Sequence, residues 1–117
     1  MEGPQERKYQ VIITELAEIH FYEILEYLYD NYPVEKAEHL AESLMDKTKS
    51  LQQLPHRGST EKRLKKRGKG YRFILFKRIS RSQIKIIYFV DEQEKKVLVT
   101  DFFPTESDDQ TIPKRNS

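Results

Sequence analysis

The spacing of apolar residues changes at Pro55 and divides this chain into two kinds of secondary structure. Before Pro55 the apolar residues recur every three or four positions, as Leu40 and Leu44 do, which is the period of an amphipathic helix. After it they gather in short runs rich in Ile, Val, Phe and Tyr, which are typical of strands. A chain whose helices precede most of its strands is predicted to fold as an α+β domain.

Two helices are predicted before Pro55, over residues 15–32 and 34–54. Thr14 is placed to cap the first helix, whose first turn is acidic, as the positive end of the helix dipole favours. Pro33 separates the helices, because the residue before a proline disfavours the α region. Since only a few residues join them, we expect an antiparallel hairpin. The apolar stripe of the second helix includes Leu40, Leu44, Leu51 and Leu54.

One strand is predicted before the helices and three after them. Short polar turns separate the last three, which favours an antiparallel meander. We therefore expect the order β-α-α-β-β-β, with the helical hairpin packed on one face of a small, mainly antiparallel sheet. The connection after Pro55 is polar and basic, with one helical turn predicted around Leu64. The predicted strands span residues 9–13, 71–76, 84–90 and 97–103.

The composition of the chain indicates where the folded domain lies and which kinds of site and location are excluded. The domain is expected to span residues 9–106, between a polar tail at 1–8 and a disordered tail at 107–117. Without cysteine, disulfides and thiolate metal sites are excluded, and His20 and His39 are expected at the surface of the helices or its boundary. We expect no metal and no cofactor. No apolar run is long enough to span a membrane, so we expect a cytoplasmic protein with no membrane partner.

Positive charge is concentrated between Arg57 and Lys85. This stretch holds twelve Lys or Arg residues and one acid, Glu61, so the net charge of +2 conceals about +11 here and about −9 elsewhere. Such a block attracts phosphate-bearing polymers in a salt-sensitive way. The alternative is a solvated loop that keeps a small protein soluble. The candidates for nucleic-acid binding are Arg57, Lys62, Arg63, Lys65, Lys66, Arg67, Lys69, Lys77, Arg78 and Arg81.

Three residues are candidates for chemistry. Arg72 and Lys85 lie among apolar neighbours in predicted strands, and we expect both to point toward one phosphate-binding surface, on the sheet face away from the helices or at its rim. The alternative is a pair of outward-facing cations that prevent aggregation through the sheet. His56 lies next to the basic stretch and is a candidate proton carrier for a phosphodiester reaction. An ordinary loop histidine fits the same position.

The order of elements and several segments resemble the RelE/ParE toxins of bacterial type II toxin–antitoxin systems. The resemblance covers residues 9–106 and rests on Leu51-x-x-Leu54-Pro55, on Tyr71-Arg72-Phe73-Ile74-Leu75 with Ile84-Lys85-Ile86-Ile87-Tyr88, and on Val97-Leu98-Val99. It implies one of two activities. RelE-like members cleave mRNA in the ribosomal A site, whereas ParE-like members inhibit DNA gyrase and lack the ribonuclease residues. It also implies a cognate antitoxin, whose acidic C-terminal segment we expect to fold onto the sheet and the basic loop.

The ribonuclease roles carry over in part. The resemblance places Lys85 where RelE-like enzymes have a strand arginine that contacts phosphate, and Lys65, Lys66 and Arg67 where they have loop lysines. The family's basic residue after the last strand is replaced by Phe103-Pro104-Thr105-Glu106, and no tyrosine follows Tyr88. The favoured hypothesis is metal-free, ribosome-dependent mRNA cleavage with Lys85, Arg72 and His56 as catalytic residues. The alternatives are a non-enzymatic inhibitor of DNA gyrase and a catalytically degenerate nucleic-acid-binding member.

Overall fold

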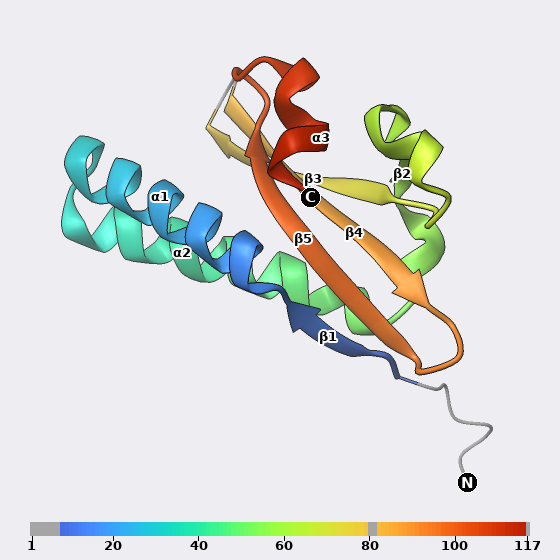
Figure 1. Cartoon of the computed structure of the whole chain (residues 1–117). Helices are drawn as coiled ribbons and strands as arrows, with labels where there is room; N and C mark the ends of the chain where they lie inside the picture. Colours follow the sequence, from blue (N-terminus) through green and yellow to red (C-terminus); the bar gives the residue numbers. More distant parts are fainter. Residues whose placement is uncertain (1–7, 80–81, 117) are drawn as a thin grey trace, which may run out of the picture.

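The computed structural model describes residues 8–79 and 82–116 of the chain. They form a five-stranded sheet in the order β1-β5-β4-β3-β2, in which β1 runs parallel to β5 and the other neighbours are antiparallel (Figure 1). The predicted α+β order is confirmed, with the short strand β2 as an unpredicted addition. The strands are β1 (Gln10–Ile13), β2 (Ser59–Thr60), β3 (Arg72–Ile79), β4 (Ser82–Asp91) and β5 (Lys96–Pro104), and the helices are α1 (Glu15–Asn31), α2 (Val34–Lys49) and α3 (Ile112–Arg115).

Helix α1 begins and ends as its sequence predicts. The Thr14 hydroxyl accepts a hydrogen bond from the backbone N–H of Ala17 at 3.2 Å, and the helix ends at Asn31, two residues before Pro33. Within the described part of the chain, no helix combines the length and the apolar character needed to cross a membrane.

Helix α2 ends earlier than predicted. It stops at Lys49, and the chain continues through the 3-10 helices η1 (Ser50–Gln52) and η2 (Pro55–Arg57). Leu54 has a φ of 50° and is 79% exposed, so it does not belong to the apolar stripe. The Arg57 guanidinium compensates for the lost helical hydrogen bonds, since it donates to the carbonyl of Gln53 at 2.8 Å and to the Ser50 hydroxyl at 2.6 Å.

The sheet is packed on both faces. The hairpin of α1 and α2 covers one face and buries Leu44, Ile86 and Phe102 in the main core. On the other face a smaller core brings together Leu64, Ile87, Phe103 and Ile112. Leu64 belongs to the 3-10 helix η3 (Lys62–Arg67), which confirms the predicted turn.

The C-terminal segment differs from the sequence-based expectation of a disordered tail from residue 107. The 3-10 helix η4 (Asp109–Thr111) and α3 follow β5 closely, and the side chain of Ile112 is fully buried. Asn116 is also buried, where its amide donates to the carbonyl of Ile112 at 2.8 Å. One apolar anchor and a set of polar contacts thus order a segment whose composition is polar. Residues 1–7 of the expected N-terminal tail lie outside the described residues.

A β-bulge at Thr100 sets which side chains of β5 face the helices. Tyr88 pairs with Val99, whereas its neighbour Ile87 pairs with Asp101, so β5 carries one extra residue. Because side chains alternate along a strand, the extra residue exchanges the two faces. Phe102 therefore enters the main core, and Asp101 stays out of it.

Gly58 allows a close approach between the η2–β2 connection and the sheet. Its N–H donates to the Tyr88 hydroxyl at 3.1 Å, and that hydroxyl donates to the carbonyl of Pro55 at 2.6 Å. Burial raises the pKa of the Tyr88 hydroxyl above its usual value. A Cβ at position 58 would lie 2.4 Å from Tyr88 Oη and 2.7 Å from the carbonyl oxygen of Phe73.

We expect Gly58→Ala to lower the free energy of unfolding by about 2–3 kcal/mol, because the methyl group has no space beside a backbone carbonyl. Urea denaturation measures the loss. Ser59→Ala is the matched control, since Ser59 is exposed and its change is expected to stay within about 0.5 kcal/mol. Equal stability of Gly58→Ala and the native chain would contradict the close approach.

Candidate functional site

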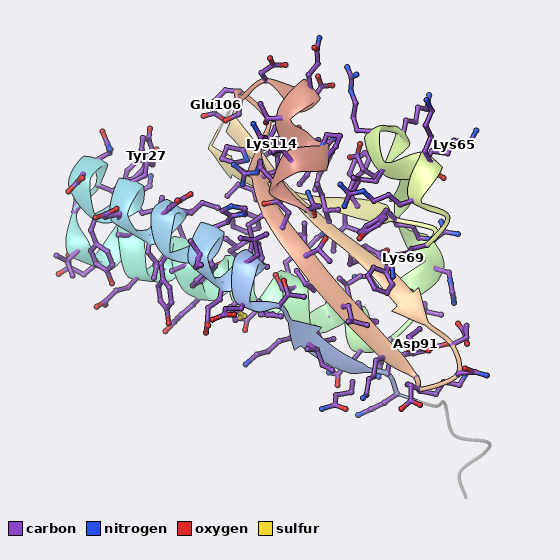
Figure 2. All side chains as sticks on the ribbon, viewed as in Figure 1. Tyr27, Lys65, Lys69, Asp91, Glu106 and Lys114 are labelled. Atoms are coloured by element: carbon purple, nitrogen blue, oxygen red, sulfur yellow. The ribbon has the colours of Figure 1, made fainter. Side chains whose placement is uncertain are left out.

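The basic residues predicted to bind nucleic acid gather on η3 and the turn that follows it. Figure 2 shows Lys65 and Lys69 at the η3 end of the molecule, far from Tyr27 on α1. Buried Leu64 anchors η3 on the sheet, so these cations are held on an ordered element. The side chains of Lys62, Lys65 and Lys66 are exposed and form no hydrogen bond or ion pair with any described residue. We call these three side chains the lysine cluster.

The two arginines of η3 have structural partners. Arg63 Nη2 lies 3.1 Å from Oδ1 of Asp109, and the Arg67 guanidinium donates to the carbonyls of Pro113 and Asn116. Both arginines therefore tie η3 to the C-terminal segment. Lys69 lies over the ring of Phe89, with 5.1 Å between its Nζ and the ring centroid. The lysine cluster is thus the part of η3 with the most freedom to meet a partner.

Three further candidates extend the basic stretch into the hairpin of β3 and β4. Lys77 is exposed on β3. Arg78 belongs to the same strand, but its side chain is not described, and Arg81 lies outside the described residues.

Arg72 and Lys85 lie on opposite faces of the sheet, so the prediction that they share one surface is wrong. Arg72 pairs with Tyr88, whose ring belongs to the main core under the helices. Lys85 pairs with Leu75 and lies on the other face. The Arg72 guanidinium donates to the carbonyl of Gly58 at 2.8 Å, at the rim of the helix-covered face.

Lys85 is bound by the one acid of the basic stretch. Its Nζ lies 2.8 Å from Oε1 of Glu61, and the Glu61 side chain is only 2% exposed. The same carboxylate accepts a hydrogen bond from the backbone N–H of Arg63 at 3.1 Å, where it caps η3. Nζ also lies 4.2 Å from the centroid of the Phe73 ring. Sequence reasoning missed this role of Glu61, although an isolated acid among twelve cations was a usable signal.

An open hollow of about 530 Å³ adjoins this ion pair. Its lining combines the cations of Lys62, Arg63 and Lys85 with the hydroxyls of Ser59 and Thr60. Its carboxylates, from Glu61 and Asp109, are each paired with a cation. The hollow is therefore suited to an anion, but neither carboxylate is free to act as a general base.

His56 lies away from this hollow and has other partners. Its Nε2 contacts Oε2 of Glu92, at the turn between β4 and β5. Hydrogen bonds from Lys95, His56 and Tyr9 lower the pKa of Glu92 to about 2. His56 does not line the hollow beside Lys85, so the structure does not bring together the three predicted catalytic residues.

A second cleft, of about 340 Å³, lies between α1, the end of β5 and the C-terminal segment. His20 lines it, and its Nδ1 lies 2.8 Å from Oδ1 of the fully buried Asp101. Arg115 donates to both oxygens of the same carboxylate, at 2.7 and 2.9 Å. The lining also includes Glu23 and Glu106, whose carboxylates disfavour phosphate here. His20 and Asp101 are 81 residues apart, and no sequence pattern linked them.

Among residues 8–79 and 82–116, no three His, Cys, Asp or Glu side chains group as a metal site requires. In a comparison with known families, residues 11–108 match the model described as ParE toxin of type II toxin-antitoxin system, parDE. No curated protein and no solved structure matches the chain.

Proposed function

The chain belongs to the ParE toxins of type II toxin–antitoxin systems, and we propose that it acts by binding DNA gyrase and not by cleaving RNA. A toxin of this family has a cognate antitoxin as its partner. The choice between the two activities depends on the hollow beside Lys85, which is the strongest structural candidate for a phosphate-cleaving site.

The Lys85–Glu61 ion pair is the observation that supports a binding toxin. A cation that stabilises a phosphate during cleavage must be able to contact the phosphate oxygens. Lys85 instead has a nearly buried carboxylate 2.8 Å from its Nζ, and its side chain is 18% exposed. If the Lys85 side chain moved away from Glu61 to contact a phosphate, the Glu61 carboxylate would stay buried without its cation, which is strongly unfavourable. The pair therefore acts as a structural element of the sheet face.

The lysine cluster supplies the charge for binding. Its three ammonium groups are exposed and unpaired within the described chain, and buried Leu64 holds their backbone in place. Exposed charges of this kind raise the association rate and the specificity for a partner more than they raise the affinity. We propose that they contact the gyrase–DNA complex, and that an acidic segment of the antitoxin covers them in the neutral state.

We expect the triple variant Lys62→Gln, Lys65→Gln, Lys66→Gln to require about tenfold more protein for half-inhibition of gyrase supercoiling. Loss of three cations should also weaken the salt dependence, by about 2–3 in the slope of log affinity against log salt. The matched control replaces three exposed lysines of α2 by Gln, namely Lys36, Lys47 and Lys49. It has the same net charge as the triple variant of the lysine cluster. Equal losses in both variants would contradict the role of the lysine cluster.

Ribosome-dependent mRNA cleavage is the second candidate, because the hollow beside Lys85 combines cations with the hydroxyls of Ser59 and Thr60. A primer-extension assay on translating ribosomes distinguishes the two activities. The proposed function predicts inhibited supercoiling and intact mRNA. Cleaved mRNA with unimpaired supercoiling would replace it with the ribonuclease activity.

A further inference from the structure

The outer face of α1 combines exposed aromatic residues with acids. The helix contains five acids, Glu15, Glu18, Glu23, Glu26 and Asp30, and no Lys or Arg. Some of its large apolar side chains are exposed, among them Tyr22 at 57% and Ile19 at 50%. Figure 1 shows that the hairpin of α1 and α2 projects beyond the sheet, so no strand among the described residues covers this face.

The exposed side chains form a stripe at helical spacing. Ile19, Tyr22, Glu26 and Tyr29 follow one another at intervals of three or four residues, so they lie along one side of α1. A shallow hollow of about 580 Å³ runs along them and is also lined by Glu23 and Asp30. A largely apolar stripe that contains Glu26 and is bordered by further acids is the complement of an amphipathic helix that carries basic side chains.

The cleft beside His20 continues this surface, because Glu23 lines both hollows. Its walls include Ile24, Phe102 and Pro104, which suit the aliphatic stem of a lysine or arginine side chain. The carboxylate of Glu23 forms no hydrogen bond or ion pair with any described residue, so its charge is available at the mouth of the cleft. The nearby guanidinium of Arg115 is held by Asp101.

We propose that the outer face of α1 binds a basic amphipathic helix of another protein, with one Lys or Arg side chain in the cleft beside His20. The five acids of α1 oppose nucleic acid and anionic lipid on this face. The most basic element of a second copy, η3, is a poor occupant, since it is one short 3-10 helix whose arginines are tied to the C-terminal segment. The surface is separate from the lysine cluster and therefore goes beyond the proposed function.

A synthetic amphipathic helix of four turns, made of Leu and Lys and labelled with fluorescein, is the probe. Anisotropy titration is expected to show saturable binding to the full chain, and the same peptide with Glu in place of Lys is expected not to bind. Glu23→Lys with Glu26→Lys should weaken binding about tenfold or more, because each reversal replaces an attraction by a repulsion. Tyr22→Ser should weaken it through the lost apolar contact.

The matched control is Glu35→Lys with Glu38→Lys, which reverses two exposed acids of α2 and is expected to change affinity less than about threefold. Circular dichroism of each variant verifies the fold. Absence of saturable binding, or an equal loss in the α2 control, would overturn the proposal. The proposal would also be overturned if the native chain self-associated and the variant with Glu23→Lys and Glu26→Lys did not. The partner of this face would then be a second copy of the chain. Gyrase is absent from this assay, so its outcome is independent of the proposed function.

Discussion

Replacement of Asp101 by Ala is expected to lower the free energy of unfolding by about 3–5 kcal/mol. The Asp101 side chain is fully buried, and it accepts hydrogen bonds from Arg115 at 2.7 and 2.9 Å and from the Asn116 amide at 3.0 Å. His20 contacts the same carboxylate at 2.8 Å. Without the carboxylate, the Arg115 side chain, which is only 22% exposed, loses the ion pair that holds it, which accounts for the size of the loss.

Urea denaturation measures this change, and Glu94→Ala is the control. Glu94 is 63% exposed and its nearest cation, Lys96, lies 3.8 Å away, so its removal is expected to stay within about 0.5 kcal/mol. Hydrogen exchange gives a local readout, because Asp101 joins α3 to the sheet. We expect the amides of α3 to lose protection in Asp101→Ala before those of β4. A loss below about 1 kcal/mol would show that the network adds little to stability.

Replacement of Glu61 by Ala is expected to cost about 3–4 kcal/mol, and Lys85→Met in the same chain is expected to restore most of it. The single change leaves the Lys85 ammonium in a mostly buried position without its carboxylate. In the double variant both charges are gone, and a Met side chain can pack on Phe73, over whose ring Nζ now lies at 4.2 Å. The double variant should therefore lie about 1 kcal/mol below the native chain, because it still lacks the Glu61 carboxylate that caps η3.

The Glu61→Ala, Lys85→Met chain also tests the function. If the chain inhibits gyrase through the lysine cluster, the double variant keeps its inhibition. If the hollow beside Lys85 cleaves RNA, the same variant loses cleavage although it is folded. Urea denaturation of the two single variants and the double variant tests the ion pair itself. If the double variant lost as much free energy of unfolding as the two single variants together, the ion pair would be contradicted.

Local sequence signals predicted the helices and strands well. Thr14 and Pro33 define the ends of α1 through effects that reach only a few residues, and the alternation in β3 and β4 reflects a period of two that any strand imposes. The same signals extended α2 to Leu54, because Leu51 and Leu54 continue the apolar spacing. Only the folded chain shows that the helix ends at Lys49 and that Leu54 points to solvent.

The placement of the candidate site depended on contacts between distant residues. Sequence alternation could not reveal the bulge at Thr100, because one extra residue in β5 is defined only by its partners on β4. The C-terminal segment is polar in composition, yet Ile112 and Asn116 are buried by packing against the sheet and η3. The prediction that Arg72 and Lys85 share one face was wrong for the same reason, because the face of each residue follows from its partner on the neighbouring strand.

By itself, the sequence determined the order of elements, the toxin family they resemble and the separation of a basic stretch from an acidic remainder, since periodicity, capping and charge are local properties. Tertiary structure alone decided which of those charges remain free. Glu61 reaches Lys85 across 24 residues, and His20 reaches Asp101 across 81, so both pairs arise only when the sheet brings their strands and helices together. Once such pairs are buried, their charges stabilise the fold, and the exposed lysine cluster and the acidic face of α1 are left to meet partners.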